Sequence, residues 1–247
     1  RKRILAGLER LDRADAFPVL AARTHEEAVA TAALLRDGSV HLLMKGAIPT
    51  GTLMHGLMTP EAGFRTGDIL SHVSLVSIPS YHKVFAITDA ALNIRPDATR
   101  KRDILLNAAG VLRQLGMDAP RVAVLAAVDT PNPQMPETLD AVSLREAGER
   151  GEFQDCVVDG PLPYDLAMSR EAAEAKGRTG PVCGEADILL VPDIACGNVL
   201  LKALRYGCGA ESAGLVVGGR APIVLTSRAA QTRDKLLPLR LASLFSL

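Results

Sequence analysis

Apolar residues along the chain follow two spacings in turn, one typical of an amphipathic helix and the other of a buried strand. Between residues 97 and 116 the apolar positions recur every three or four residues, which predicts a helix that begins at Asp97 and ends before Gly116. The next apolar run, 122–128, shows no alternation with polar residues. A strand covered by helices on both faces has this pattern, so a strand is predicted there.

The same rhythm continues along the rest of the chain. Residues 69–78 and 84–88 look like two extended segments around a turn at 79–82, which predicts a hairpin or an edge pair. Regular alternation of helices and strands is typical of an α/β protein with a largely parallel sheet. Further helices are predicted over 24–37, 137–150, 165–176, 198–206 and 229–245, and further strands over 40–44, 156–158, 187–191, 214–218 and 222–226.

The first of these helices carries a start signal and a stop signal. Thr24 is followed three residues later by Glu27, which is the pattern of a capping box. Gly38 comes directly after the periodic residues, as is typical of a helix C-terminus. The helix is therefore expected to span 24–37.

Composition and charge narrow the class of protein. The chain has 247 residues, of which 48% are hydrophobic and 23% charged, as in ordinary globular domains. Its 28 basic and 28 acidic side chains cancel, which argues against a dedicated nucleic-acid surface. No apolar run reaches the roughly 18–20 residues of a membrane span. We therefore expect a globular protein that binds neither nucleic acid nor membrane.

Cysteine usage indicates the compartment. The four cysteines form no C-x-x-C pair and have no interleaved histidines, so neither a metal site nor a disulfide framework is expected. Buried free thiols in a reducing cytoplasm are the better interpretation. Cys196 lies near Gly197 and Asn198, but a buried thiol without a base beside it is a poor nucleophile, so covalent catalysis by this thiol is not expected.

Candidate chemistry lies in loops at the carboxyl ends of predicted strands, where helix N-termini direct their amides. Ser227 also fits a helix N-cap, and Lys45 a solvated charge. Asp193 and Asn198 fit a loop and a cap in the same way. Arg228 is harder to explain structurally, because a guanidinium beside a helix N-terminus repels the dipole unless an anion lies there. The four loops contain Lys45 and Gly46; Asp159, Gly160 and Pro161; Asp193, Gly197 and Asn198; and Ser227 and Arg228.

Several common site motifs are missing from the sequence. Gly218 and Gly219 do not form a G-x-G-x-x-G fingerprint that opens a helix, and the sequence contains neither a G-x-S-x-G elbow nor a phosphate loop. His72 lies within the 69–78 segment, and none of the histidines has an evident carboxylate partner by spacing.

Seven short motifs stand in a defined order along the chain. They are Leu43-Met44-Lys45-Gly46; Arg65-Thr66-Gly67 with Ser71-His72-Val73; Ile87-Thr88-Asp89-Ala90-Ala91 with Asn93-Ile94; Asn132-Pro133-Gln134-Met135-Pro136; Asp159-Gly160-Pro161-Leu162; Val191-Pro192-Asp193-Ile194 with Gly197-Asn198; and Leu225-Thr226-Ser227-Arg228. Together they resemble the phosphate acetyltransferase and phosphate butyryltransferase family over nearly the whole chain. The butyryl branch is the closer one.

The resemblance implies a two-domain architecture like that of isocitrate and isopropylmalate dehydrogenases. Two α/β domains with largely parallel sheets would face a central cleft, the first formed by 1–68 with 219–247 and the second by 69–218. Family chains usually have a further strand and helix before the segment at which this chain starts. The implied activity is reversible transfer of a short-chain acyl group between coenzyme A and inorganic phosphate, in a homodimer, without a metal or bound cofactor.

The resemblance also implies roles for individual residues. Ser227 would orient the thiol, Arg228 would stabilise charge on phosphate or on the oxyanion, and Asp234, seven positions after the serine, would exchange the thiol proton. Lys45, His55 and Arg65 would form the phosphate site, with Arg65 as the substitute for an arginine that many members carry near the position of His55. The remaining cleft-lining residues would be Gly46, Asp159, Gly160, Pro161, Asp193, Gly197 and Asn198.

Two other functions remain open from the sequence. His55 and Ala230 depart from the family pattern, which fits a member that binds acyl-CoA without turnover. A dehydrogenase that uses NAD(P) on a related scaffold is the second, and it usually needs a metal-binding aspartate cluster that the sequence does not show.

Overall fold

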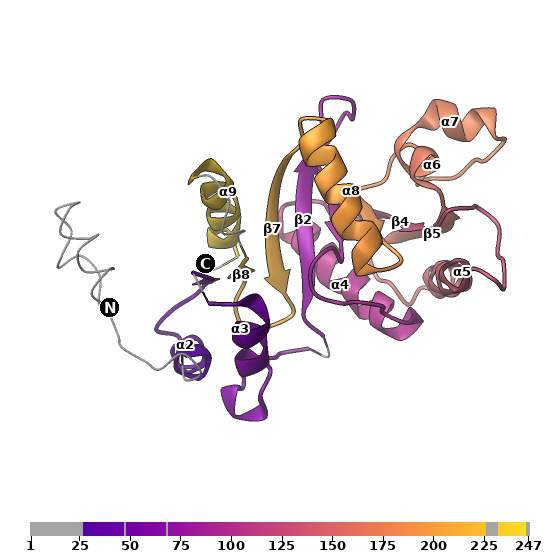
Figure 1. Ribbon diagram of the computed structural model, residues 1–247. Coiled ribbons are helices and arrows are strands. Elements are labelled where there is room, and N and C mark those ends of the chain that lie inside the picture. Colours follow the sequence, from indigo (N-terminus) through magenta and orange to yellow (C-terminus); the bar gives the residue numbers. More distant parts are fainter. Residues whose placement is uncertain (1–26, 47, 68, 226–231, 246–247) are drawn as a thin grey trace. The chain divides into compact units, whose positions relative to one another are not determined.

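The computed structural model describes residues 27–245 except 47, 68 and 226–231 (Figure 1). The chain divides into two compact units. The first unit consists of Arg1–Val40 and Ala47–Phe64, and the second of His41–Gly46 and Arg65–Leu247. The second unit holds the sheet and most of the candidate site residues.

The first unit, in its described part, is helical. Helix α2 spans Glu27–Arg36 and is followed by Gly38 at φ 77°, so the predicted helix and its glycine stop are confirmed, while Thr24 lies outside the described residues. Helix α3 spans Thr50–Leu57 and a short 3-10 helix, η1, spans Pro60–Ala62. Neither of these was predicted, because the eight-residue span of α3 contains two glycines and only one turn of apolar spacing.

The second unit is built on one eight-stranded sheet. Strands β3, β6, β4 and β5 are parallel, whereas β2 pairs antiparallel with β3 on one side and with β7 on the other. Strands β8 and β1 form a parallel pair that runs opposite to β3. The order is β1 (Leu43–Met44), β8 (Ile223–Val224), β7 (Glu211–Val217), β2 (Ser71–Ser77), β3 (Phe85–Thr88), β6 (Ile188–Leu190), β4 (Arg121–Leu125) and β5 (Val157–Leu162).

This topology confirms the predicted α/β class with a largely parallel sheet. The hairpin predicted around residues 79–82 is also confirmed as the β2–β3 pair. It lies in the middle of the sheet and not at an edge, because β7 comes back from the far end of the chain to pair along all seven residues of β2.

Helices cover both faces of this sheet and bury its alternating side chains (Figure 1). In β3, Ile87 packs with the cluster under α6 (Tyr164–Met168), α7 (Arg170–Ala175) and α8 (Ile194–Gly207), whereas Ala86 packs with the cluster under α4 (Ala98–Gln114) and α5 (Pro136–Glu149). In β6, Leu189 packs with the first of these clusters and Ile188 with the second. Helix α9 (Thr232–Ser243) packs on β7 and β8. The unbroken apolar runs of the sequence are therefore explained by burial on both sides.

Capping residues set the ends of two helices. Asp97 caps α4 by accepting a hydrogen bond from the Arg100 backbone N–H at 2.9 Å, as the sequence indicated. The helix predicted over 165–176 is interrupted at Ser169, whose side chain accepts a hydrogen bond from the Ala172 backbone N–H at 3.1 Å. The interruption separates α6 from α7, since a capping serine starts a new helix.

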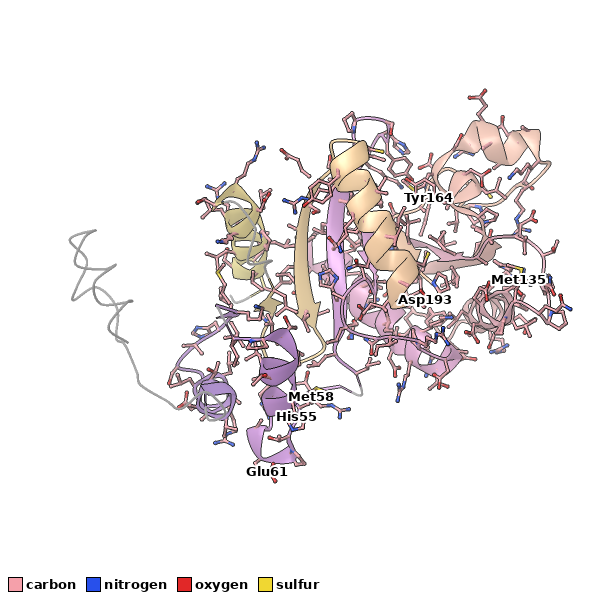
Figure 2. The ribbon with its side chains drawn as sticks, viewed as in Figure 1. His55, Met58, Glu61, Met135, Tyr164 and Asp193 are labelled. Atoms are coloured by element: carbon pink, nitrogen blue, oxygen red, sulfur yellow. The ribbon has the colours of Figure 1, made fainter. Side chains whose placement is uncertain are left out.

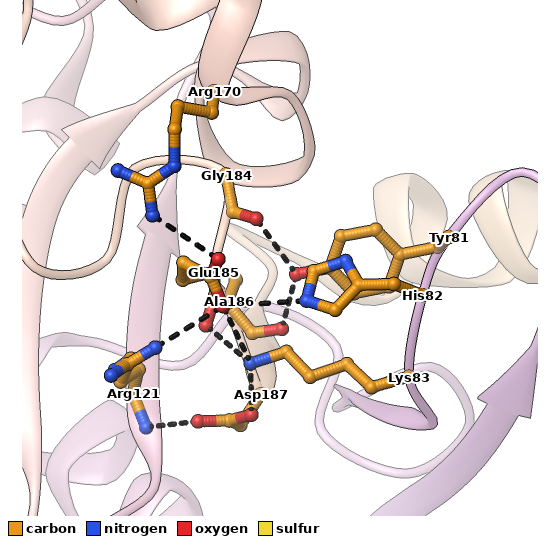
Figure 3. A network of polar contacts seen from close by, with 9 residues as sticks. All are labelled: Tyr81, His82, Lys83, Arg121, Arg170, Gly184, Glu185, Ala186 and Asp187. Carbon is orange, nitrogen blue, oxygen red and sulfur yellow. Dashed lines mark hydrogen bonds and ion pairs between the residues drawn. The ribbon is translucent and has the colours of Figure 1, made fainter.

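A network of ion pairs joins the amino-terminal ends of β3, β4 and β6 (Figure 3). Glu185 accepts hydrogen bonds from Arg121 at 3.2 Å and from Arg170 at 3.1 Å. Asp187 accepts one from Lys83 at 2.6 Å and another from the Arg121 backbone N–H at 2.8 Å. The network thus ties the loop after β2 to the starts of two parallel strands, at the edge away from their carboxyl ends.

Candidate functional site

The carboxyl ends of β3 and β6 lie side by side, since Thr88 and Leu190 are register partners in the parallel pair. Helix α8 begins directly after β6, and Asp193 lies at its start (Figure 2). The Asp193 side chain accepts a hydrogen bond from the Cys196 backbone N–H at 2.8 Å. Asp193 therefore acts as the N-cap of α8, which was the structural alternative for this residue.

Helix α8 is held against the loop that follows β3. A Cβ atom at Gly197 would lie 3.0 Å from the Asp89 carbonyl oxygen and 3.0 Å from Ala90 Cα, so only glycine fits without displacing backbone. The next residue also contacts this loop, since Asn198 Nδ2 donates a hydrogen bond to the Ala90 carbonyl oxygen at 3.2 Å. The structure thus brings Asp193, Gly197 and Asn198 together, and each of them positions the N-terminus of α8.

A buried carboxylate organises the loop after β3. Asp89 is 2% exposed and accepts hydrogen bonds from the backbone N–H groups of Ala91 and Leu92 at 2.9 Å each. Its other oxygen accepts from the His72 backbone N–H at 3.0 Å and from Asn93 Nδ2 at 2.6 Å. In the sequence, Asp89 stands out only as part of a motif. The signal for its role was its place directly after a buried strand.

His72 is the second buried polar group at this edge. Burial lowers the pKa of its imidazole while the charge of Asp89 works in the opposite direction, so the ring is neutral at pH 7. Thr88 Oγ1 donates a hydrogen bond to the His72 carbonyl oxygen at 2.9 Å. No carboxylate partner was expected for the histidines from sequence spacing. The fold brings the ring of His82 to a carboxylate, since its Nε2 lies 3.3 Å from Glu185 Oε2, whereas Asp89 accepts its hydrogen bond from the backbone N–H of His72.

The Lys-Gly step lies at the end of the β1–β8 pair. Lys45 is 6% exposed, its backbone N–H donates to the Val224 carbonyl oxygen at 3.0 Å, and its Nζ donates to the Gly46 carbonyl oxygen at 3.1 Å. Strand β8 ends beside it, and the chain continues towards Ser227 and Arg228, which lie outside the described residues. Strands β1 and β8 are parallel neighbours, so Lys45-Gly46 and Ser227-Arg228 follow, along the chain, two strands that end side by side.

Asp234 lies in the first turn of α9 and is paired with a cation from α8. Its Oδ2 is 2.6 Å from Arg205 Nη2. A cavity of about 300 Å³ opens beside this pair, and Tyr206, Ser212 and Leu237 are among the residues that line it. The side chain that was predicted to exchange a thiol proton is therefore ion-paired and next to a cavity.

The three predicted phosphate ligands lie in different parts of the chain. Arg65 is exposed and forms an antiparallel bridge with Gly219, just past the carboxyl end of β7. Lys45 follows β1, which runs opposite to β7. His55 is exposed on α3, in the other unit (Figure 2). Their common role in binding phosphate stays a prediction.

Asp159, Gly160 and Pro161 were expected in a loop after a strand over 156–158, and this placement was wrong. They lie inside β5, where Asp159 pairs with Arg178 at 2.9 Å and Arg145 donates to the Gly160 carbonyl oxygen at 3.2 Å. Strand β5 is the edge of the sheet, where proline is tolerated because its missing N–H breaks no inner ladder. A cavity of about 480 Å³ lies beside these side chains.

The cysteines of the described part of the chain form no disulfide. All four cysteines are free, but Cys196 and Cys208 are exposed, so the expectation of buried thiols was wrong for these two. Partial burial and the charge of Asp193 raise the pKa of the Cys196 thiol, so it is protonated at pH 7. In the same residues, no three His, Cys, Asp or Glu side chains are placed to hold a metal ion, and no helix is both long and apolar enough to cross a membrane.

Comparisons with known proteins give a consistent answer. The family model described as "Phosphate acetyl/butaryl transferase" matches residues 12–241. A phosphate acetyltransferase from Rhizobium meliloti is 42% identical over 244 residues, which are 99% of this chain and 77% of the relative. A phosphate butyryltransferase from Clostridium acetobutylicum is 42% identical over 211 residues, covering 85% of this chain and 70% of the relative.

Solved structures agree with the sequence relatives. A branched-chain phosphotransacylase from Enterococcus faecalis superposes with a TM-score of 0.85 at 37% identity, over 92% of this chain and 82% of the other. A 4-hydroxythreonine-4-phosphate dehydrogenase from Salmonella typhimurium gives a TM-score of 0.58 at 14% identity, over 95% and 75% of the two chains, which confirms the dehydrogenase-like fold and nothing more. The chain belongs to the phosphate acetyl/butyryl transferase family.

Proposed function

We propose that the protein transfers a short-chain or branched acyl group between coenzyme A and inorganic phosphate. The observation that carries the proposal is the family match across 12–241, together with 37% identity to a branched-chain phosphotransacylase over 92% of the chain. Acyl-CoA is the substrate in this proposal, and no bound cofactor takes part.

The reaction balances without an external acid or base. Hydrogen phosphate attacks the thioester carbonyl carbon, a C–O bond forms, and the C–S bond breaks with its electron pair going to sulfur. The proton that phosphate gives up is the proton that the thiolate gains, so the enzyme has to move it from one to the other. A carboxylate within reach of both groups performs this transfer in either direction.

In the proposal, the carboxylate is that of Asp234, and Ser227 orients the thiol. Arg228 stabilises the charge that builds on the carbonyl oxygen, and a donor placed there in advance is worth ~10²–10³ in rate. Lys45, Arg65 and His55 are the proposed phosphate ligands, and holding phosphate close to the carbon contributes several kcal/mol through proximity.

The other predicted cleft residues keep a proposed role beside coenzyme A. Asp193, Gly197 and Asn198 fix the N-terminus of α8 against the loop after β3, and coenzyme A is proposed to bind beside this end of the helix. Gly46 follows Lys45, and the remaining three residues, Asp159, Gly160 and Pro161, border the cavity at β5 or adjoin its lining.

A homodimer is part of the proposal, and exposed apolar side chains support it. Val199 and Tyr206 on α8 are 67% and 83% exposed, and Ile94, whose carbonyl accepts a hydrogen bond from the first residue of α8, is 71% exposed. Exposed apolar patches of this kind commonly mark protein contacts. A cytoplasmic location is likewise proposed, on the ground of the four free cysteines.

One assay separates this function from its two rivals. We expect the protein to release free thiol from butyryl-CoA only when phosphate is present. Thermal stabilisation by coenzyme A without thiol release would favour a binding protein without turnover, and stabilisation by NAD alone would favour a dehydrogenase.

Ser227→Ala and Arg228→Ala should each lower turnover sharply, and wild-type rates in both would remove this site from the mechanism. Arg65→Gln should raise the KM for phosphate and leave that for acyl-CoA little changed.

A further inference from the structure

We infer that Arg205 is a positioning residue that holds Asp234 in the orientation needed for proton exchange with the thiol. The inference rests on the proposed function, because it concerns how one of the proposed catalytic groups is controlled. It starts from the short contact between Asp234 Oδ2 and Arg205 Nη2, which are 2.6 Å apart. Charge-assisted hydrogen bonds of this length are the strong ones in proteins.

Arg205 and Asp234 each lie at the end of a helix where the helix dipole favours their charge. Arg205 lies in the last turn of α8, and Asp234 lies in the first turn of α9. Helix dipoles favour a cation at a C-terminus and an anion at an N-terminus. Each side chain is therefore at the helix end that stabilises its charge, and the pair links two helices that are separated along the chain by β7 and β8.

A neighbouring ion pair shows what an ordinary surface contact looks like here. Arg233, one residue before Asp234, pairs with Glu211, and their side chains are 75% and 57% exposed. The Arg205 and Asp234 side chains are only 36% and 28% exposed. Because the Arg233–Glu211 pair is more exposed, solvent screens it far more than the Arg205–Asp234 pair. Exposed pairs of this kind contribute little to holding a side chain in one geometry.

The chemical consequence follows from the geometry. With Oδ2 bound to Arg205, rotation of the carboxylate is restricted, so Asp234 exchanges the proton from one fixed orientation beside the cavity that it lines. In the direction that consumes acyl phosphate, the thiol proton moves to the Asp234 carboxylate, the sulfur electron pair attacks the carbonyl carbon, and the C–O bond to phosphate breaks with its electron pair going to phosphate. A shift of about 1 Å in such a group is enough to lower a rate about 10²-fold.

The test is a double-mutant cycle on kcat with butyryl-CoA and phosphate. Arg205→Gln should lower kcat about 10- to 100-fold and leave the KM for phosphate within about twofold, because the guanidinium acts on Asp234 and not on phosphate. Arg205→Lys should recover part of the loss, since it keeps the charge. In an Asp234→Asn background, Arg205→Gln should lower kcat by less than about twofold, because its target is already gone. Arg233→Gln is the matched control and should keep the wild-type kcat.

Each other outcome has a distinct meaning. If the Arg205 and Asp234 effects multiply, or if Arg205→Lys is as slow as Arg205→Gln with an unchanged melting temperature, Arg205 does not act through Asp234 and the inference is overturned. A wild-type rate in Asp234→Asn overturns it as well. If the wild-type protein itself shows no phosphate-dependent thiol release, the proposed function fails first. Melting temperatures of all variants separate these outcomes from loss of folding.

Discussion

The buried carboxylate of Asp89 offers the sharpest test of how the β3 loop is built. Replacing it by asparagine changes one oxygen into an NH₂ group and hardly alters the volume. Asparagine retains one oxygen for the two backbone N–H groups of Ala91 and Leu92. The amide nitrogen then faces the His72 backbone N–H and Asn93 Nδ2, which are both donors.

The size of the effect follows from these contacts. A hydrogen bond to a charged group is worth about 1.5–3 kcal/mol, and two are lost. Asn93 does not rescue them by turning its amide over, because its Nδ2 also donates to the Leu70 carbonyl oxygen at 2.9 Å. Burying a neutral amide costs less than burying a carboxylate, which offsets part of this loss. We therefore expect a net decrease of about 2–4 kcal/mol in the free energy of unfolding.

Denaturation measures this directly. For a chain of this size, Asp89→Asn should lower the melting temperature by roughly 5–15 °C and shift the urea midpoint accordingly. Asp118→Asn is the matched control, because Asp118 is exposed in the loop before β4. The turnover of Asp89→Asn should also fall, since Asn198 anchors α8 to this loop through Ala90. An unfolding free energy within about 0.5 kcal/mol of wild type would refute the role assigned to Asp89.

Two further changes probe the packing of α8 and the ion-pair network. Gly197→Ala places a Cβ 2.9–3.0 Å from Val191 Cγ2 and from the 89–90 backbone, so overpacking of about 1–3 kcal/mol should exceed the gain of about 1 kcal/mol in helix propensity. Gly110→Ala in α4, where nothing lies within 4 Å, should instead stabilise, and equal melting temperatures for the two variants would contradict the contact. Burial works to raise the pKa of Glu185, but hydrogen bonds from Arg170 and His82 outweigh it, so the pKa is below its ordinary value of 4.5. This stabilisation is present above pH 4.5 and is lost as the pH falls through the lowered pKa, so Glu185→Gln should destabilise by about 1–2 kcal/mol at pH 7 and much less at pH 3, as measured by urea midpoints. A difference that does not depend on pH would rule out the charge as its cause.

The sequence by itself determined many of the helices and strands and the family. The helical spacing before Gly116, the apolar run at 122–128 and the seven ordered motifs depend on local chemistry, so helix α4, strand β4 and the acyltransferase family followed from them. The glycine after α2 and the start of α4 at Asp97 were readable for the same reason, because each depends on backbone groups within four residues.

Only the tertiary structure decided which of these elements meet. Strand β7 pairs with β2 from more than 130 residues away and so places the hairpin in the middle of the sheet, which no local spacing encodes. The contacts between His72 and Asp89, and between Arg205 and Asp234, arise in the same way. Pairing along an edge strand also placed Asp159 and Pro161 in β5, although glycine and proline favour a loop locally. Pairing between distant strands outweighs the conformational preference of single residues, because it buries far more surface and satisfies more hydrogen bonds than one turn of chain can.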